Sequence, residues 1–374
     1  MIIQYVVIFI TLVAVFFFSN TRCDSESGQQ QMRKWFVWIL SGLCVLQSGL
    51  RHIGVGADTY SYLLLFEEAH ESSWQQIFHN FHEVYVEGTG KDAGYTLLVK
   101  IFQVFSNDYR MYLLFVAIFF FTAFAVFIYR NTENFRDIVF AFILYEALFY
   151  AFFSITGIRQ TLATGFALWG FECIKSRRWI VFTCLILFAA FIHKSILLFL
   201  PYYFIGNIRR SRTIFIIAIL GFPALMVFRR AFAIWLASLS FSDLYMMYAE
   251  STYKSGTYTF TALILLIAFF GWIFMKPVLE SNPGSFRYFN AMAIAIVLTP
   301  LTWVDPSLMR VVQYFSVFML VLIPAIVNAV ITYPVALRTW TYAIMIVALI
   351  YLIAKVGLDY KFMWQPMKVE GISY

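Results

Sequence analysis

Long apolar runs separated by short polar segments recur along almost the whole chain. A helix needs roughly 17–25 mainly apolar residues to cross a bilayer, and about twelve runs approach that length. The pattern therefore predicts an all-α polytopic membrane protein in which residues 1–374 form a single integral membrane domain. The predicted spans are residues 2–18, 35–50, 111–129, 137–153, 158–174, 179–193, 195–208, 213–229, 259–275, 287–304, 310–330 and 338–356.

The segment GYTLLVKIFQVF at 95–106 is apolar but short for a span, and Lys100 lies in its middle. The positive-inside rule decides its placement, because short cytoplasmic loops carry an excess of lysine and arginine. If 95–106 stays outside, the basic stretches KSRR (175–178) and IRRSR (208–212) lie in the cytoplasm. If it spans, both stretches move outside, so we expect it to remain on the outer side.

This topology makes residues 51–106 an extracytoplasmic segment and residues 230–258 a second outer loop. Aromatic and polar residues alternate in the first segment, which predicts amphipathic helices on the membrane surface at about 59–70 and 74–86. The same topology places five polar side chains at the outer ends of helices. They are Arg51, Asp58, Arg159, His193 and Arg310.

Composition supports the membrane assignment. The chain is 62% hydrophobic and 13% charged, with a mean hydropathy of +0.78, whereas soluble domains are about 45–50% apolar and about 25% charged. The net charge of +7 comes from basic residues in short loops, so we expect no nucleic-acid binding. The cysteines lack metal-binding spacing and are expected to be free thiols, and residues 1–18 are expected to be a retained first helix.

Arginine and histidine at the outer helix ends are the candidates for chemistry, because ionisable residues at membrane depth are costly. Arg159 follows Gly157 at a helix start, where free N–H groups favour anions, and its guanidinium binds phosphate in a bidentate manner. The alternative is an arginine that anchors the helix at the interface. His193 is either structural or a base, since its side chain titrates near neutral pH. Arg310 shares one helix face with Gln313 and Tyr314.

No metal site or cofactor is expected. His79 and His82 are three residues apart with Glu83 nearby, but no further ligands follow at fixed spacing. The chain also lacks GxSxG, Walker, Rossmann and HExxH motifs. The polar residues instead suggest a phosphate-bearing substrate that is approached from the outer face.

Five segments together resemble the EpsG family of bacterial exopolysaccharide proteins, which are Wzy-like polymerases. They occur in family order across roughly residues 50–320. They are RHIGVGADTYSY (51–62), KDAGY (91–95), FYAFFSITGIRQTLATGFAL (149–168), AAFIHKSILLFLPYY (189–203) and MRVVQYF (309–315).

The resemblance implies a Wzy-like or GT-C-like glycosyltransferase of the bacterial cytoplasmic membrane. It would join oligosaccharide repeat units on polyprenyl pyrophosphate at the outer face, building exopolysaccharide, capsule or O-antigen. Donor and acceptor would both be lipid-linked, and a chain-length regulator and a flippase of the same pathway would be partners, together with membrane lipids. Fixed cations would stabilise the departing pyrophosphate.

The resemblance also suggests roles for individual residues. Arg51, Arg159 and Arg310 would hold the pyrophosphate, with Gln160 and Tyr314 beside them, and Tyr62 and Tyr95 would offer faces to sugars. The glycines of GVGA would let the backbone approach a sugar or phosphate closely. Either His193 or Asp58 would be the base, with His193 favoured because it titrates near neutral pH and Asp58 expected to orient sugar or arginine.

Three other functions compete with polymerisation. A flippase or transporter would need charged residues along a path through the membrane, whereas these charges collect at one face. An acyltransferase would use external histidine and arginine but would not need three arginines for a pyrophosphate. A ligase or single-sugar transferase shares the lipid donor and the base, so only its products separate it from a polymerase.

Overall fold

The computed structural model describes residues 2–20, 25–56, 58–87, 93–239, 243–251, 257–329, 335–356 and 360–366. Within these ranges every regular element is helical, apart from an isolated antiparallel bridge between Arg51 and Phe362. The α-helices are α1 (Ile2–Asn20), α2 (Glu26–Gly49), α3 (Thr59–Glu71), α4 (Trp74–His82), α5 (Ala93–Gln103), α6 (Tyr109–Asn131), α7 (Phe135–Leu148), α8 (Ile158–Lys175), α9 (Trp179–Ile192), α10 (Tyr202–Ile205), α11 (Ser211–Val227), α12 (Arg229–Ser238), α13 (Asp243–Ala249), α14 (Tyr258–Ser281), α15 (Phe286–Leu298), α16 (Met309–Ser316), α17 (Met319–Ala329) and α18 (Val335–Val356). Short π and 3-10 segments complete the set: η1 (Glu83–Glu87), η2 (Tyr150–Thr156), η3 (Lys194–Phe199), η4 (Pro283–Ser285), η5 (Thr299–Trp303) and η6 (Pro306–Leu308).

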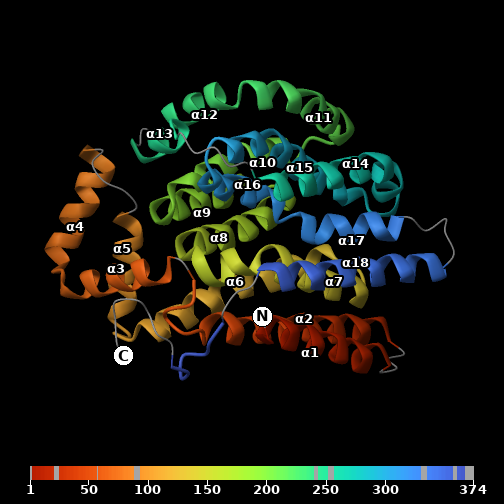
Figure 1. Ribbon diagram of the computed structural model, residues 1–374, viewed down its shortest axis with the longest axis horizontal. Coiled ribbons are helices and arrows are strands. Elements are labelled where there is room, and N and C mark those ends of the chain that lie inside the picture. The colour runs from red at the N-terminus through yellow and green to blue at the C-terminus, as the bar shows by residue number, and fades with distance from the viewer. Residues whose placement is uncertain are drawn as a thin grey trace.

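The long helices run side by side, and α3, α4 and α5 lie together at one end of the bundle (Figure 1). α6 packs against α2 and α8, and α8 packs against α9. Further along, α11 packs on α15, while α14 and α7 pack on α17. The all-α architecture predicted from the apolar runs is confirmed.

The expected number of membrane crossings is not confirmed. Among the described residues, two helices, α6 and α14, are long and apolar enough to cross alone. The total is five if each bent pair counts as one span, with bends of 69° between α7 and η2, 96° between α11 and α12, and 54° between α16 and α17. The other predicted spans fall on helical chain, but as shorter or less apolar pieces such as α9, which has 14 residues. A count of about twelve therefore stays a prediction.

Contacts between α3 and α5 explain why the apolar segment 95–106 contains a lysine. Lys100 Nζ donates to the backbone carbonyl of His70 at 3.0 Å, and Gln103 Nε2 donates to that of Phe66 at 2.7 Å. Both acceptors lie in the later turns of α3, where cations and donors are favourable. α5, with 11 residues, is accordingly a packed end helix, and it ends at Gln103.

α7 carries two buried carboxyl groups that bind neighbouring helices. Glu146 accepts a hydrogen bond from Gln47 Nε2 of α2 at 3.0 Å. Asp137 accepts from Asn328 Nδ2 of α17 at 2.7 Å and from Tyr342 of α18 at 3.2 Å. Each carboxyl therefore joins α7 to another helix through polar side chains, as buried charges require.

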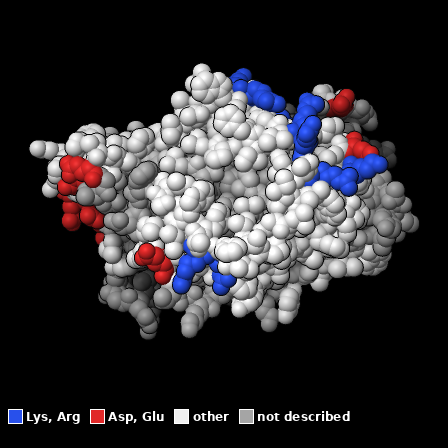
Figure 2. All heavy atoms as spheres, turned by 90° about the horizontal axis from the view of Figure 1, so that it is seen from above, with Lys and Arg blue, Asp and Glu red and all other residues white. Residues whose placement is uncertain are grey.

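Two polar groups lie at opposite ends of α8. Arg159 is in its first turn, and at its last turn Glu172 pairs with Arg130 at 2.9 Å and with Lys175 at 2.7 Å. A helix of 18 residues is about 27 Å long, close to the roughly 30 Å of a bilayer core. Figure 2 shows acidic side chains gathered at the α3 and α4 end of one face, and most of the basic side chains, with further acidic ones, toward the other end.

The described segments agree with the predicted outer helices in extent. α3, and α4 together with η1, occupy the ranges where interfacial helices are expected, and residues 230–258 hold most of α12 and all of α13. Their place on the outer side stays a prediction. The thiols of Cys44, Cys173 and Cys184 are free, while Cys23 lies outside the described residues.

Candidate functional site

A break in the helical chain places Arg159 and Gln160 in the first turn of α8. The π segment η2 bends by 69° from α7 and ends at Gly157, whose N–H donates to the carbonyl of Phe152 at 2.9 Å. Thr161 Oγ1 donates to the carbonyl of Phe153 at 2.7 Å, which holds the new helix against η2. Arg159 therefore lies near the positive end of a helix dipole, where a bound anion would offset the like charges.

Gln160 joins α8 to α16 through its side-chain amide, and Tyr314 extends the connection to η3. Its Nε2 donates to the backbone carbonyl of Arg310 on α16 at 2.7 Å. Its Oε1 accepts from the hydroxyl of Tyr314 at 3.2 Å, and that hydroxyl also shares a hydrogen bond of 3.0 Å with Ser195 Oγ on η3. Gln160, Ser195 and Tyr314 are all buried, so the hydrogen bonds form a continuous polar path inside the protein.

The other end of this path reaches the surface through Arg310. Its Nη2 lies 3.6 Å from Oδ2 of Asp58, and their side chains are 31% and 40% exposed. Asp58 precedes α3 and makes no capping hydrogen bond with its side chain, so the carboxylate faces Arg310. At this exposure the ion pair is worth at most about 1 kcal/mol, and a more highly charged anion can displace it.

Arg159 lies over two tyrosine rings. Its guanidinium carbon is 5.6 Å from the ring centroid of Tyr62 and 5.9 Å from that of Tyr95, and its Nε is 3.5 Å from the Tyr62 hydroxyl. Such rings hold the cation in place through their negative faces. Both rings are buried and contact Arg159, and the expectation that they offer faces to a sugar stays a prediction.

His193 lies at the junction of α9 and η3 and is 6% exposed. Its N–H caps α9 by donating to the carbonyl of Ala189 at 2.9 Å, and its own carbonyl accepts from Ile196 at 3.2 Å. It is two residues from Ser195 and so belongs to the segment that meets Tyr314. Its role as the base stays a prediction.

Arg51 is separate from this network. Its side chain is buried, with Nη1 donating to the carbonyl of Ser48 and Nη2 to that of Ile155 at 3.3 Å. Burial lowers the pKa of the Arg51 guanidinium, and the neighbouring phenol of Tyr109 raises it. Arg51 therefore binds a free carbonyl at the end of α2 and another in η2, and its role in holding the pyrophosphate stays a prediction.

Two glycines of the matched segments serve packing. Gly56 has a φ of +105°, and a Cβ there would lie 2.4 Å from Cγ2 of Ile155. A Cβ at Gly94 would lie 2.4 Å from the carbonyl oxygen of Phe191. Gly56 therefore lies close to Ile155, and its expected approach to a sugar or phosphate stays a prediction. Gly94 lets α5 dock on the end of α9 beside His193.

Sequence reasoning missed Ser195 and Tyr85. The Tyr85 hydroxyl donates to the carbonyl of Phe191 at 2.7 Å and accepts from Gly94 N at 3.3 Å, which ties η1 and α5 to α9. Ser195 lies inside the quoted segment AAFIHKS, so a signal was available for it. No local signal marks Tyr85, because its partners are remote in the chain.

The described residues contain no group of three or more histidine, cysteine, aspartate or glutamate side chains that could hold a metal ion. His79 and His82 instead face Glu83 at 3.5 Å and Glu87 at 3.3 Å in exposed pairs. What the site offers to a ligand is two arginines, one carboxylate and a buried path of hydroxyl and amide groups.

Comparison with known proteins gives one match. The model of the EpsG family matches residues 34–367, which include every residue of the site. No curated protein and no solved structure matches the chain.

Proposed function

The chain belongs to the EpsG family, and on this premise we propose that it is a polysaccharide repeat-unit polymerase. It is a membrane protein, and we assign it to the bacterial cytoplasmic membrane as a multi-pass glycosyltransferase. Its substrates are oligosaccharides linked to polyprenyl pyrophosphate, both as donor and as acceptor. The observation that carries the proposal is the set Asp58, Arg310, Gln160, Tyr314 and Ser195, joined at one end of the helical bundle.

The proposed reaction forms one glycosidic bond and breaks one. A hydroxyl of the acceptor sugar attacks the anomeric carbon of the donor, and the bond from that carbon to the pyrophosphate oxygen breaks. The hydroxyl proton passes to a base, and the pyrophosphate leaves with the electron pair. Because negative charge builds on the leaving group, fixed cations in a water-poor site accelerate the step.

Arg159 and Arg310 are the proposed ligands of the pyrophosphate. The Arg159 guanidinium is held over Tyr62 and Tyr95. Gln160 holds the backbone of Arg310, whose guanidinium faces Asp58. An arginine has five N–H donors in a fixed fork, which leaves Arg310 with donors for phosphate beyond its contact with Asp58.

His193 is the proposed base and Asp58 the proposed orienting group. Asp58 faces Arg310, so its carboxylate is engaged with a cation. His193 lies in the segment that carries Ser195. The assignment gives the two groups different tasks: Asp58 holds Arg310 in the resting site, and His193 accepts the proton.

The site is proposed to face outward from the cytoplasm. The support is the charge distribution, since Arg130, Lys175 and the KSRR stretch lie at the opposite end of α8 from Arg159. Basic loops favour the cytoplasmic side. The outer face is also where lipid-linked repeats would meet a growing chain.

The product of the purified protein tests the proposal. The protein in lipid nanodiscs is incubated with a defined lipid-linked repeat, and the saccharides are separated on a gel. A ladder of products supports a polymerase, and a single addition would assign the chain to the transferases or ligases. Unchanged lipid under conditions that keep the protein folded would overturn the enzymatic assignment.

A further inference from the structure

We propose that the cavity between η3 and α12 holds the first isoprene units of the lipid carrier. Lys194 at its edge would add a third cation to the pyrophosphate. This inference rests on the proposed function, because it assigns a place to the hydrophobic part of the same substrate. No residue of the cavity is among those predicted from the sequence.

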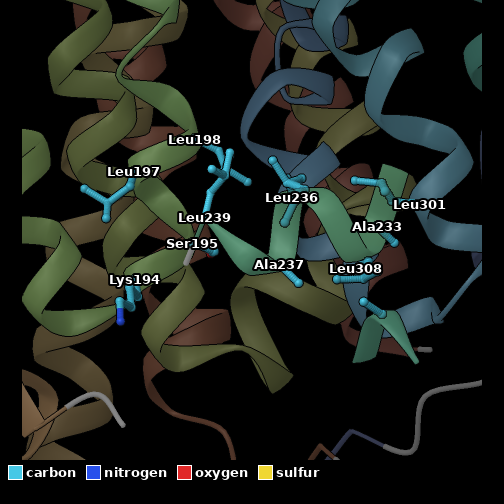
Figure 3. Close-up of a pocket in the computed structure, with 12 residues that line it drawn as sticks. Lys194, Ser195, Leu197, Leu198, Ala233, Leu236, Ala237, Leu239, Leu301 and Leu308 are labelled. Atoms are coloured by element: carbon cyan, nitrogen blue, oxygen red, sulfur yellow. The ribbon is translucent and has the colours of Figure 1, made fainter. Parts of the chain in front are cut away.

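The cavity is apolar and of the size of a small-molecule site. Its volume is about 370 Å³, and ten of its twelve lining residues are alanine, leucine or valine. Figure 3 shows leucines of η3 and α12 facing one another, with Leu301 and Leu308 beside Ala233. Ligand sites range over about 300–1,000 Å³, so this one takes part of a long isoprenoid and leaves the remainder in the bilayer.

Two residues connect the cavity to the polar site. Ser195 lines the cavity and also shares a hydrogen bond with Tyr314. Val311 lines it too, next in the chain to Arg310, which faces Asp58. A molecule with an apolar chain in the cavity therefore has its head group beside Arg310 and Tyr314.

The charge at the cavity edge fits an anionic head group. Lys194 is the one charged lining residue. In the described part of the chain it is half-buried and forms no salt bridge with a carboxylate. Lys194 lies at an edge of the set in Figure 3, while the leucines surround the cavity. An apolar interior with a cation at its edge is complementary to a lipid phosphate and not to a neutral apolar ligand.

A second cavity shows that an apolar lining alone does not identify the binding site of the lipid carrier. The cavity between α7, α14, α17 and α18 is larger, about 530 Å³, and no ionisable residue lines it. It accepts a hydrocarbon chain equally well but has no cation for a phosphate. This second cavity is therefore a matched control for the first.

Photo-crosslinking tests the assignment without turnover. The probe is a polyprenyl diphosphate with a diazirine on its first isoprene unit, added to the protein in nanodiscs and mapped by mass spectrometry. We expect labels on Leu197, Leu198 and Leu236, removed by unlabelled undecaprenyl diphosphate but not by phosphatidylglycerol. Labels on residues that line the second cavity, or equal competition by phosphatidylglycerol, would overturn the proposal.

A filled cavity gives an independent measurement. Ala237→Phe places a ring in the first cavity, and Ala348→Phe does so in the second. We expect Ala237→Phe to raise the KM for lipid-linked donor about tenfold with kcat nearly unchanged, as for one misfitting apolar group. Ala348→Phe should leave both parameters at the level of the unsubstituted protein. Equal KM values in the two variants, both with normal melting temperatures, would sink the inference.

Lys194→Gln covers the case in which Ala237→Phe does not fold. It should weaken competition by undecaprenyl diphosphate in the crosslinking assay while labelling stays in the same residues. Unaltered competition would remove Lys194 from the proposal. The two proposals fail separately: a ladder without labelling in the cavity contradicts only the lipid assignment, and labelling without any glycosyl transfer contradicts only the polymerase.

Discussion

Gln160 donates through Nε2 to the backbone carbonyl of Arg310 at 2.7 Å, across 150 positions of the chain. This bond fixes the height of α16 relative to α8 and leaves the Arg310 guanidinium to face Asp58. Gln160 is thus a positioning residue, because it acts on the proposed anion site through the arginine.

Gln160→Leu should reduce activity, because Gln160 holds the backbone of Arg310 in place. The change removes two buried hydrogen bonds, one to the Arg310 carbonyl and one from the Tyr314 hydroxyl, which together are worth about 1–3 kcal/mol. We expect the melting temperature to fall and kcat to drop by about tenfold, since about 1.4 kcal/mol corresponds to one power of ten. Gln313→Leu on α16 is the control, because Gln313 Oε1 is buried and has no hydrogen-bond partner among the described residues. Equal losses in the two variants would argue against a specific role for Gln160.

Arg159→Lys and Arg310→Lys should each lower kcat by about two to three powers of ten, the usual effect of losing one oriented charge-stabilising group. Lysine keeps the charge but loses the planar fork that matches phosphate. Steady-state kinetics with a lipid-linked repeat measures the loss.

Arg51→Lys, measured beside these two variants, distinguishes an effect on stability from an effect on catalysis. The Arg51 guanidinium binds the carbonyls of Ser48 and Ile155, so we expect the lysine variant to have a lower melting temperature. A lysine at position 159 or 310 should leave that temperature nearly unchanged. Full activity of both the Arg159 and Arg310 lysine variants would show that these arginines only anchor helices.

His193→Ala should bind lipid-linked donor normally and turn it over roughly 10²–10⁴-fold more slowly, as expected for a lost general base. The same ratio should hold with EDTA present, since two arginines supply the charge in the proposed mechanism. Normal turnover by this variant would assign the role of base to Asp58. Activity lost in EDTA and restored by Mg²⁺ would contradict a mechanism that relies on arginine alone.

Cysteine labelling tests the proposed topology. In a cysteine-free background, an impermeant maleimide added outside should modify cysteine placed at position 70 on α3. It should not modify cysteine at position 176, after α8, or at position 211, where α11 begins. Labelling of 176 from outside would reverse the bundle and place the proposed site in the cytoplasm.

Acid should loosen the segment 360–366 from the loop after α2. His52 Nδ1 accepts from the backbone N–H of Gly54 at 3.1 Å, and the backbone N–H of His52 donates to the carbonyl of Lys361 at 2.8 Å. Burial, with Arg110 and Lys361 nearby, lowers the pKa of His52 below its usual 6.5. The unfolded state then binds more protons, so this contribution is complete above that pH and is lost as the pH falls through the folded pKa.

Hydrogen exchange reports this change. The amide of Met363, which donates to the carbonyl of Leu50 at 2.8 Å, should lose protection between about pH 7 and about pH 5 after correction for intrinsic exchange. His52→Asn keeps an acceptor that does not titrate, so its protection should not depend on pH in this range. Identical pH dependence in both proteins would exclude His52 as the cause.

The sequence predicts the helical content well because apolar runs have a local signature. It does not predict where helices break. The run 137–153 divides at Phe149 into α7 and η2, and the run 213–229 ends where α11 bends by 96° into α12. These bends depend on packing between distant segments, which periodicity does not record.

The candidate site is predictable in part for the same reason. Arg159, Gln160, Arg310 and Tyr314 come from two matched segments, but the bond from Gln160 to the Arg310 carbonyl depends on how α8 meets α16. Arg51 shows the opposite case. It follows the end of α2, where free carbonyls attract cations, so helix-end chemistry alone favours the inward contact that the structure has.

The bridge between Arg51 and Phe362 also sets an order of events during synthesis. Tyr360 donates to the carbonyl of Gln47 at 2.6 Å, and the two residues are 313 positions apart. At about 5–20 residues per second, a ribosome makes Tyr360 roughly 15–60 s after Gln47. The loop that precedes Asp58 therefore forms its contacts with residues 360–362 only after that interval. A message cut short before codon 360 would yield a nearly full-length helical bundle in which the loop before Asp58 lacks this contact.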